Sequence, residues 1–300
     1  TPSGFVDPEV IVLQLDEPDG SPVATIVNYA CHPTIMAHLN RLITPDYPGQ
    51  VRRVVEASVG GRCLFLQGAT GNQASIEDLS SDPASYRRIG NILGHEAAKL
   101  VWSIRTPPGK PVFDNVLESG APLGLFKWVE EPQPARKLLV FERDVEVATK
   151  DVRPAEELQA EWERQMEVLD ALRAQGADEE AIRDASYKAR RLGIQVGLAR
   201  RVAGRRTITI PVQVMALGDI AFLCAPVEIF AEIGVAIKQK SPFALTVVSG
   251  YSNGAMGYLP TAQAHREGGY EVDASPFGPE AEGQFTDACL AMLREAFSAR

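Results

Sequence analysis

The chain has 300 residues, of which 45% are apolar, and this is enough for one large domain with a substantial core. Its formal net charge is −9 and no stretch is densely basic, which argues against the phosphate-driven binding of a nucleic-acid partner. No window approaches the roughly 18 continuous apolar residues of a membrane-spanning helix, so we expect no integral membrane segment.

The first third of the chain predicts strands and helices in alternation. Residues 10–15 and 23–30 have the composition of two strands joined by a turn. A helix is predicted to end at Gly60, before a third strand at 63–66. A long helix follows from residue 83, because apolar side chains then recur at helical spacing.

The middle of the chain divides into two segments of different character. Residues 112–148 alternate weakly and predict one or two strands, including 137–147. Residues 154–200 are charged, rich in alanine and poor in β-branched side chains, which favours helix. Gly176 interrupts this segment, so we predict a helical hairpin inserted into the main domain.

The last third predicts three more strands, of which the first contains Pro211 and is therefore expected at a sheet edge. A helix, a long glycine-rich loop and a final helix complete the chain. Glu228 is expected in the first turn of the earlier helix. The predicted strands are 207–215, 220–225 and 245–249, the helices are 227–240 and 280–297, and the loop is 250–277.

These elements predict an α/β fold, a layered domain with a mixed β-sheet flanked by helices. We expect residues 1–300 to form a single domain with 154–200 as the insertion, and, because the chain starts at Thr1 without a methionine, we expect part of the protein to be missing upstream. The cysteines at 31, 63, 224 and 289 are far apart and form no CxxC pair. They are therefore interpreted as reduced core residues.

Four of the predicted strands end in small or polar residues, and ligand sites in α/β folds form beyond the carboxyl ends of strands. His32 follows the strand at 23–30, and Asn72 lies in the loop after the strand at 63–66. Glu228 follows the strand at 220–225, and Tyr251 follows the strand at 245–249. We therefore predict that these strand ends converge on one site.

Each of these residues also has a purely structural interpretation. A histidine after a strand is more often a hydrogen-bonded structural residue than a metal ligand. A carboxylate such as Glu228 is stabilised in a first helical turn by the helix dipole alone. Tyr251 and Tyr258 are acid/base groups, ligands or packing residues, and His265 is a candidate substrate contact. The loop at 68–72 lacks the spacing of a phosphate loop, and the sequence contains no HExxH motif.

Four segments, in this order, resemble the neutral/alkaline ceramidase family, and most closely its shorter bacterial members. They are residues 28–33 (NYACHP), 67–72 (QGATGN), 225–228 (APVE) and 250–258 (GYSNGAMGY). The resemblance implies a zinc-dependent amidase that cleaves N-acyl bonds. It also implies zinc ligands at His32, Glu228 and Tyr258, matching one of the family's two zinc histidines, its glutamate and its tyrosine.

The sequence departs from the family pattern in three ways. The other zinc histidine belongs to an upstream segment that precedes Thr1, so we expect it in a separate chain from the same precursor or in a missing part of the protein. Ala74 stands where the family has its proposed serine nucleophile. The membrane-associated tail of true ceramidases has no counterpart, so we expect a small or medium N-acyl substrate in place of ceramide.

The resulting hypothesis is a Zn²⁺-dependent amide hydrolase that uses zinc-activated water. Asn72 and the loop amides around Gly71 are candidate oxyanion donors, and Tyr251 or His265 is a candidate proton donor. Two alternatives stay open. The first is a ligand-binding relative without catalysis, and the second is a hydrolase in which Thr1 is an N-terminal nucleophile.

Overall fold

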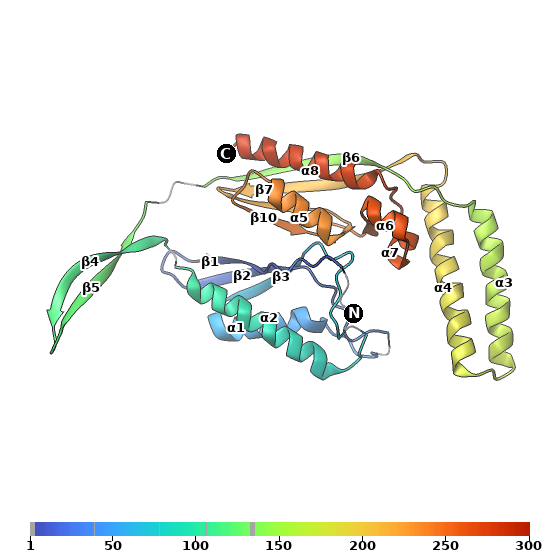
Figure 1. Cartoon of the computed structure of the whole chain (residues 1–300), viewed down its shortest axis with the longest axis horizontal. Helices are drawn as coiled ribbons and strands as arrows, with labels where there is room; N and C mark the ends of the chain where they lie inside the picture. The colour runs from blue at the N-terminus through green and yellow to red at the C-terminus, as the bar shows by residue number, and fades with distance from the viewer. Residues whose placement is uncertain (1–3, 39, 78, 106, 133–135) are drawn as a thin grey trace.

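The computed structural model of the chain describes residues 4–300 with the exception of 39, 78, 106 and 133–135. Two main sheets form successive layers, with helices packed against them, and two hairpins project from this body (Figure 1). The predicted layered α/β architecture is confirmed, although the strands form several sheets where one was expected. Thr1 lies outside the described residues, so the fold does not bear on its proposed role.

The first sheet has the order β1-β2-β3 and is covered by two helices (Figure 1). β1 and β2 form an antiparallel hairpin, and β3 pairs parallel to β2 after a helical crossover. The two helices can pack closely because Gly94 of one faces Val54 of the other. The elements are β1 (Ile11–Asp16), β2 (Pro22–Tyr29), α1 (Asp46–Val59), β3 (Arg62–Gln67) and α2 (Pro83–Ser103).

The second sheet has the order β10-β8-β7-β6 and is mixed, since β10 and β8 are parallel and the other pairs are antiparallel. Alternate side chains of β7 are buried, as expected for a strand with one face on the core. The elements are β6 (Leu138–Ala148), β7 (Thr207–Leu217), β8 (Ile220–Cys224), α5 (Ala231–Lys240), β10 (Leu245–Ser249) and α8 (Ala281–Ser298).

The expected edge position of the strand with Pro211 is wrong for the strand as a whole but holds locally. β7 lies between β6 and β8 in the sheet. Its pairing with β8 covers only residues 213–217, so at Pro211 the strand has β6 as its one neighbour. Proline is tolerated at such a locally unpaired edge.

Two hairpins extend from opposite ends of the body (Figure 1). Helices α3 (Ala155–Ala174) and α4 (Glu179–Val202) occupy the segment in which a helical hairpin is predicted. Strands β4 (Gly109–Glu118) and β5 (Pro122–Glu130) pair only with each other in an antiparallel ribbon. With β6, the segment predicted to hold one or two strands therefore contributes three.

Two further predictions need correction. Glu228 lies in the short strand β9 (Glu228–Ile229), not in a helix, because α5 begins only at Ala231. The predicted loop 250–277 contains β11 (Tyr258–Leu259), α6 (Ala262–Glu267) and α7 (Tyr270–Ala274). β9 and β11 exist because they pair with each other, and a two-residue strand leaves no periodic pattern in the sequence.

One buried side chain joins the two main sheets. Asn28 of β2 donates from Nδ2 to the carbonyl of Leu66 at 3.0 Å and to the carbonyl of Val248 in β10 at 3.1 Å. Close by, the Gly250 N–H donates to the Gln67 carbonyl at 3.1 Å. These bonds hold the carboxyl ends of β2, β3 and β10 next to one another.

All four cysteines are buried and present as thiols, in agreement with their interpretation as core residues. Burial raises the pKa of the Cys63 thiol to about 11, which makes it unreactive at neutral pH. Within the described part of the chain, no helix is long and apolar enough to cross a membrane.

The Asn28 contacts generate a stability prediction. Asn28→Ala removes both side-chain hydrogen bonds and leaves two buried carbonyls without that donor, so we expect the free energy of unfolding to fall by about 2–4 kcal/mol. Asn91→Ala is the matched control, because it removes only a solvent-exposed hydrogen bond from Gln50 of α1, and it should change this free energy by no more than about 0.5 kcal/mol. Urea unfolding measures both, and equal effects would contradict the bridging role.

Candidate functional site

Four strand ends deliver polar side chains to one place. β2 leads to His32, β3 leads to the loop at residues 68–73, β8 leads to Glu228, and β10 leads to Tyr251. The β9–β11 pairing adds Tyr258, whose Cα is the register partner of the Glu228 Cα. The backbone of Tyr251 is tied to the same place, because its N–H donates to the Val227 carbonyl at 3.3 Å.

The functional atoms of three of these residues lie in mutual contact. Nε2 of His32 is 3.2 Å from Oε2 of Glu228. The Tyr251 hydroxyl donates to the same Oε2 at 2.6 Å and lies 3.1 Å from the His32 Nε2. The His32 and Glu228 side chains are only 16% and 18% exposed, so this contact is largely shielded from water.

The orientation of the His32 ring is fixed by a backbone carbonyl. Its Nδ1 is 3.0 Å from the Gln73 carbonyl oxygen, which also accepts the His32 backbone N–H at 2.9 Å. A carbonyl can only accept, so Nδ1 carries a proton and the neutral ring presents the Nε2 lone pair to the Glu228 carboxylate. Two acceptor atoms at this distance require a cation between them, either a second proton on His32 or a metal ion.

His32 and Glu228 each stabilise the charged form of the other. Burial lowers the pKa of His32, but the hydrogen bonds to Glu228 and Gln73 and the Glu228 charge outweigh it, so the pKa lies above its usual 6.5. Burial raises the pKa of Glu228, but the hydrogen bonds from His32 and Tyr251 outweigh it and leave the pKa below its usual 4.5. The carboxylate is therefore ionised at neutral pH.

Both tyrosines remain protonated at neutral pH. Burial, followed by the effects of Glu228, raises the pKa of Tyr251 and the pKa of Tyr258 well above the usual 10.0.

Tyr251 has a backbone φ of 55°, in the left-handed region that bulky side chains rarely adopt. Such a conformation costs about 1–3 kcal/mol and is concentrated at functional sites. Tyr258 packs near His32, with ring centroids 6.2 Å apart.

The donor set fits zinc. An imidazole nitrogen, a carboxylate oxygen and a phenol oxygen are all zinc ligands, and two ligands of a tetrahedral zinc are about 3.3–3.6 Å apart. The His32–Glu228 separation of 3.2 Å is close to this, and the Nδ1–carbonyl bond is the outer contact that zinc-binding histidines make. Without the tyrosines the set is too small, since the described residues include no group of three or more His, Cys, Asp or Glu placed to hold a metal.

The structure places two predicted site residues outside this contact. Asn72 accepts from the Ala231 N–H at 2.9 Å and donates to Glu232 at 2.8 Å, so its side chain caps α5 and is not placed as an oxyanion donor. The Gly71 N–H is likewise used, by the Ile229 carbonyl at 2.7 Å. His265 lies on α6, where burial and then Lys150 lower its pKa, and its charged neighbours are Lys150, Glu280 and Glu282.

Sequence reasoning missed two residues at the site. Gln73 acts through its backbone carbonyl, which no side-chain pattern reveals. Thr70 is fully buried, and its Oγ1 has no partner within normal hydrogen-bond geometry, although it is close enough to Tyr251 to lower the pKa of that phenol. A small polar residue in a glycine-bearing loop after a strand was the available signal for Thr70.

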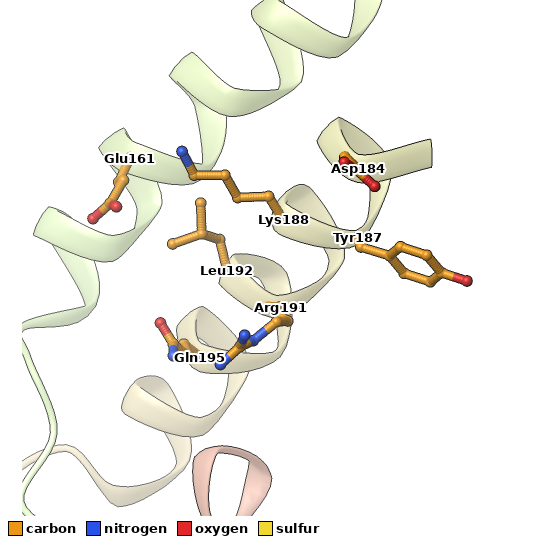
Figure 2. A pocket seen from close by; sticks show the side chains of 7 residues that line it. All are labelled: Glu161, Asp184, Tyr187, Lys188, Arg191, Leu192 and Gln195. Atoms are coloured by element: carbon orange, nitrogen blue, oxygen red, sulfur yellow. The ribbon is translucent and has the colours of Figure 1, made fainter. Parts of the chain in front are cut away.

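A hollow in the described surface lies away from this chemistry. It has a volume of 360 Å³ and is formed on the helical hairpin by residues of α3 and α4. Figure 2 shows Lys188 and Leu192 of α4 on the side of Glu161, while Tyr187 points away from α3. The hollow is open and lined mainly by charged side chains, so we assign it no part in the site.

Comparison with solved structures shows the fold. The chain is similar to the neutral ceramidase from Pseudomonas aeruginosa, with a TM-score of 0.59 and 19% identity over 97% of this chain and 47% of that one. A structure described as ceramidase complexed with C2 gives a TM-score of 0.60 and 17% identity over 97% and 48%. The chain thus spans about half the length of both. No family model and no curated protein sequence matches.

The close approach of Gly71 to β9 generates a prediction. A Cβ on Gly71 would lie 2.4 Å from the Glu228 carbonyl oxygen and 2.7 Å from Cδ1 of Phe230. We expect Gly71→Ala to displace Glu228 and to lower the free energy of unfolding by about 1–3 kcal/mol. Gly283→Ala is the matched control, because nothing lies within 4 Å of its Cβ position in α8, and it should stabilise by about 0.5–1 kcal/mol. Thermal unfolding measures both changes in stability. If the two variants were both destabilised or both stabilised, the result would contradict the geometry.

Proposed function

We propose that the protein is a zinc-dependent hydrolase that cleaves the amide bond of a small or medium N-acyl compound. The observation that carries this proposal is the contact of His32, Glu228 and Tyr251 at converging strand ends, in a chain that shares its fold with ceramidases. The proposed ligands are His32 through Nε2, Glu228 through Oε2 and Tyr258. When bound, zinc lowers the pKa of a water molecule and polarises a carbonyl group.

The neighbouring residues prepare these ligands. The Gln73 carbonyl holds His32 in the tautomer that presents Nε2, and this contact also increases the basicity of the ring. The β9–β11 pairing sets Tyr258 beside Glu228, close enough for the carboxylate to raise the pKa of the Tyr258 phenol. Because these constraints come from the backbone, the proposed zinc-binding side chains are held in place before the metal binds.

Tyr251 is the proposed proton donor to the leaving amine. Its side chain is 37% exposed while its hydroxyl touches both His32 and Glu228, so it reaches the site from the solvent side. Its raised pKa keeps the proton on the phenol at neutral pH. With the Asn72 side chain and the Gly71 N–H used structurally, the Tyr251 hydroxyl is also the proposed contact for the developing oxyanion.

Metal analysis of single variants tests the proposal. We expect the wild-type chain to bind one zinc ion, and His32→Ala and Glu228→Gln to bind it at least about 100-fold more weakly, since even outer contacts are worth about 10–100-fold. Glu232→Gln is the matched control, because this carboxylate contacts Asn72 and lies outside the proposed ligand set. Equilibrium dialysis measures the affinities, and zinc binding that is unchanged in both ligand variants would overturn the proposal.

The roles of the two tyrosines are distinguished by their phenylalanine variants, for which zinc affinity and turnover are both measured. Tyr258→Phe should weaken zinc binding, while Tyr251→Phe should keep the zinc and lose about 10²–10⁴-fold in turnover of an N-acyl substrate series. The reverse pattern would exchange the two roles.

The alternative functions give distinct outcomes. A chain that binds no zinc and hydrolyses no amide of the series would be a ligand-binding relative without catalysis. Activity that survives chelation and is lost in Thr1→Ala would instead identify an N-terminal nucleophile. Neither outcome is compatible with the zinc proposal.

A further inference from the structure

The ribbon formed by β4 and β5, here called the arm (residues 109–130), extends away from the body (Figure 1). Every residue of β5 is exposed, and so is every residue of β4 except Gly109 and Val112. An isolated two-stranded hairpin is at best marginally stable in water. An arm of this length therefore needs a partner surface.

One face of the arm is apolar along its length. The register pairs Pro111 with Trp128, Phe113 with Phe126, and Val116 with Gly124. Phe113 and Phe126 are 55% and 65% exposed and make an edge-to-face contact with ring centroids 5.9 Å apart. The space above Gly124 borders both rings, since the nearest ring atoms lie 3.7 and 3.8 Å from its Cβ position. A contiguous exposed apolar face of this kind marks an interaction surface.

The charges of the arm do not favour a charged partner. Lys127 pairs with Asp114 at 2.9 Å, and Lys110 pairs with Glu131 at 3.5 Å. Within the arm, two lysines stand against three acidic residues, so it has no excess positive charge for an anionic lipid surface or a nucleic acid. Near-neutrality also means that two arms can approach each other without strong repulsion.

A receiving surface lies at the base of the same arm. A hollow of 560 Å³ is formed there between the arm and the end of α2, and it is lined by Trp102, Ile104 and Trp128. Trp102 is 70% exposed and Ile104 is 43% exposed. Arg105 stacks on Trp128 at 4.3 Å from the ring centroid and so forms part of the wall. Gln14, Asp16 and Glu130 complete the wall, so the hollow is a groove of mixed character with an apolar part, and no described residue of the same chain fills it.

We propose that the partner is a second copy of this chain, bound by reciprocal exchange of arms. About a twofold axis, two arms lie antiparallel with their apolar faces together, which brings the tip of each to the base of the other. The Phe113–Phe126 pair is midway along the arm and meets its symmetry copy at the axis. Leu117 and Leu123 at the tip are on the opposite face and are 50% and 49% exposed, so a tip seated between the partner's arm and α2 turns them toward Trp102 and Ile104.

The area of such a contact is sufficient for a stable dimer. Strands of this length span about 30 Å, and a ribbon about 10 Å wide presents about 300 Å² on one face. Reciprocal exchange buries this face on both chains and adds the groove of each, which brings the total toward the lower end of the range for specific interfaces, about 1,200 Å². One-sided docking of a single arm would give about half of that.

The oligomeric state of the full chain tests the proposal. Light scattering at about 10 μM should give twice the chain mass of 32.5 kDa. Phe113→Ser combined with Phe126→Ser should give a monomer with an unchanged circular dichroism spectrum, because both rings are exposed in the single chain. Val140→Ser is the matched control, an exposed apolar residue of β6 outside the arm, and should remain dimeric.

Disulfide trapping tests the reciprocal geometry. The native cysteines are buried, so a mixture of Leu123→Cys and Ile104→Cys chains should form a covalent dimer, while Ser298→Cys mixed with Ile104→Cys should not. A monomeric wild-type chain, or a dimer that survives in the double phenylalanine variant, would overturn the proposal. A monomer that binds phosphatidylcholine vesicles through the arm would overturn it in favour of a lipid surface.

Discussion

The site depends on one electrostatic constraint, the meeting of two acceptor atoms. The Gln73 carbonyl fixes the His32 proton on Nδ1, so the Nε2 lone pair faces the Glu228 carboxylate at 3.2 Å. Such a pair is stable only with positive charge between its members, which a second proton on His32 or the proposed zinc ion would supply. Both sheets contribute to this contact, because His32 follows a strand of the first and Glu228 follows a strand of the second. The link through Asn28 therefore supports the site as well as the fold.

Part of this could be read from the sequence. The strand ends that carry His32, Glu228 and Tyr251 were predictable, because apolar runs that stop at polar residues indicate buried strands and their termini. The secondary structure around Glu228 was not, because β9 is two residues long and exists only through pairing with β11. The Gln73 carbonyl and the positive φ of Tyr251 are properties of the folded backbone, without a side-chain signature. Asn72 could not be separated from a catalytic residue because its partner, the start of α5, is distant in sequence.

The shared ceramidase fold and the arm describe different aspects of the chain. Similarity at under 20% identity establishes the architecture that brings the strand ends together, while the substrate remains a proposal. The arm is a separate feature of this chain, since no described residue covers its apolar face or fills the groove at its base. Arm exchange would cover the apolar face and fill the groove with residues of a second copy of the chain. It would leave the site at the other end of the strands unobstructed.

X-ray absorption spectroscopy of the zinc-loaded chain tests the central claim most directly. Binding by His32, Glu228 and a tyrosine predicts a first shell of nitrogen and oxygen alone, at about 2.0–2.2 Å, with the outer-shell signature of one imidazole. Cys31 is the neighbour of His32 in the chain and offers the competing ligand. A zinc–sulfur distance of about 2.3 Å, or a shell of six oxygens without imidazole, would contradict the account.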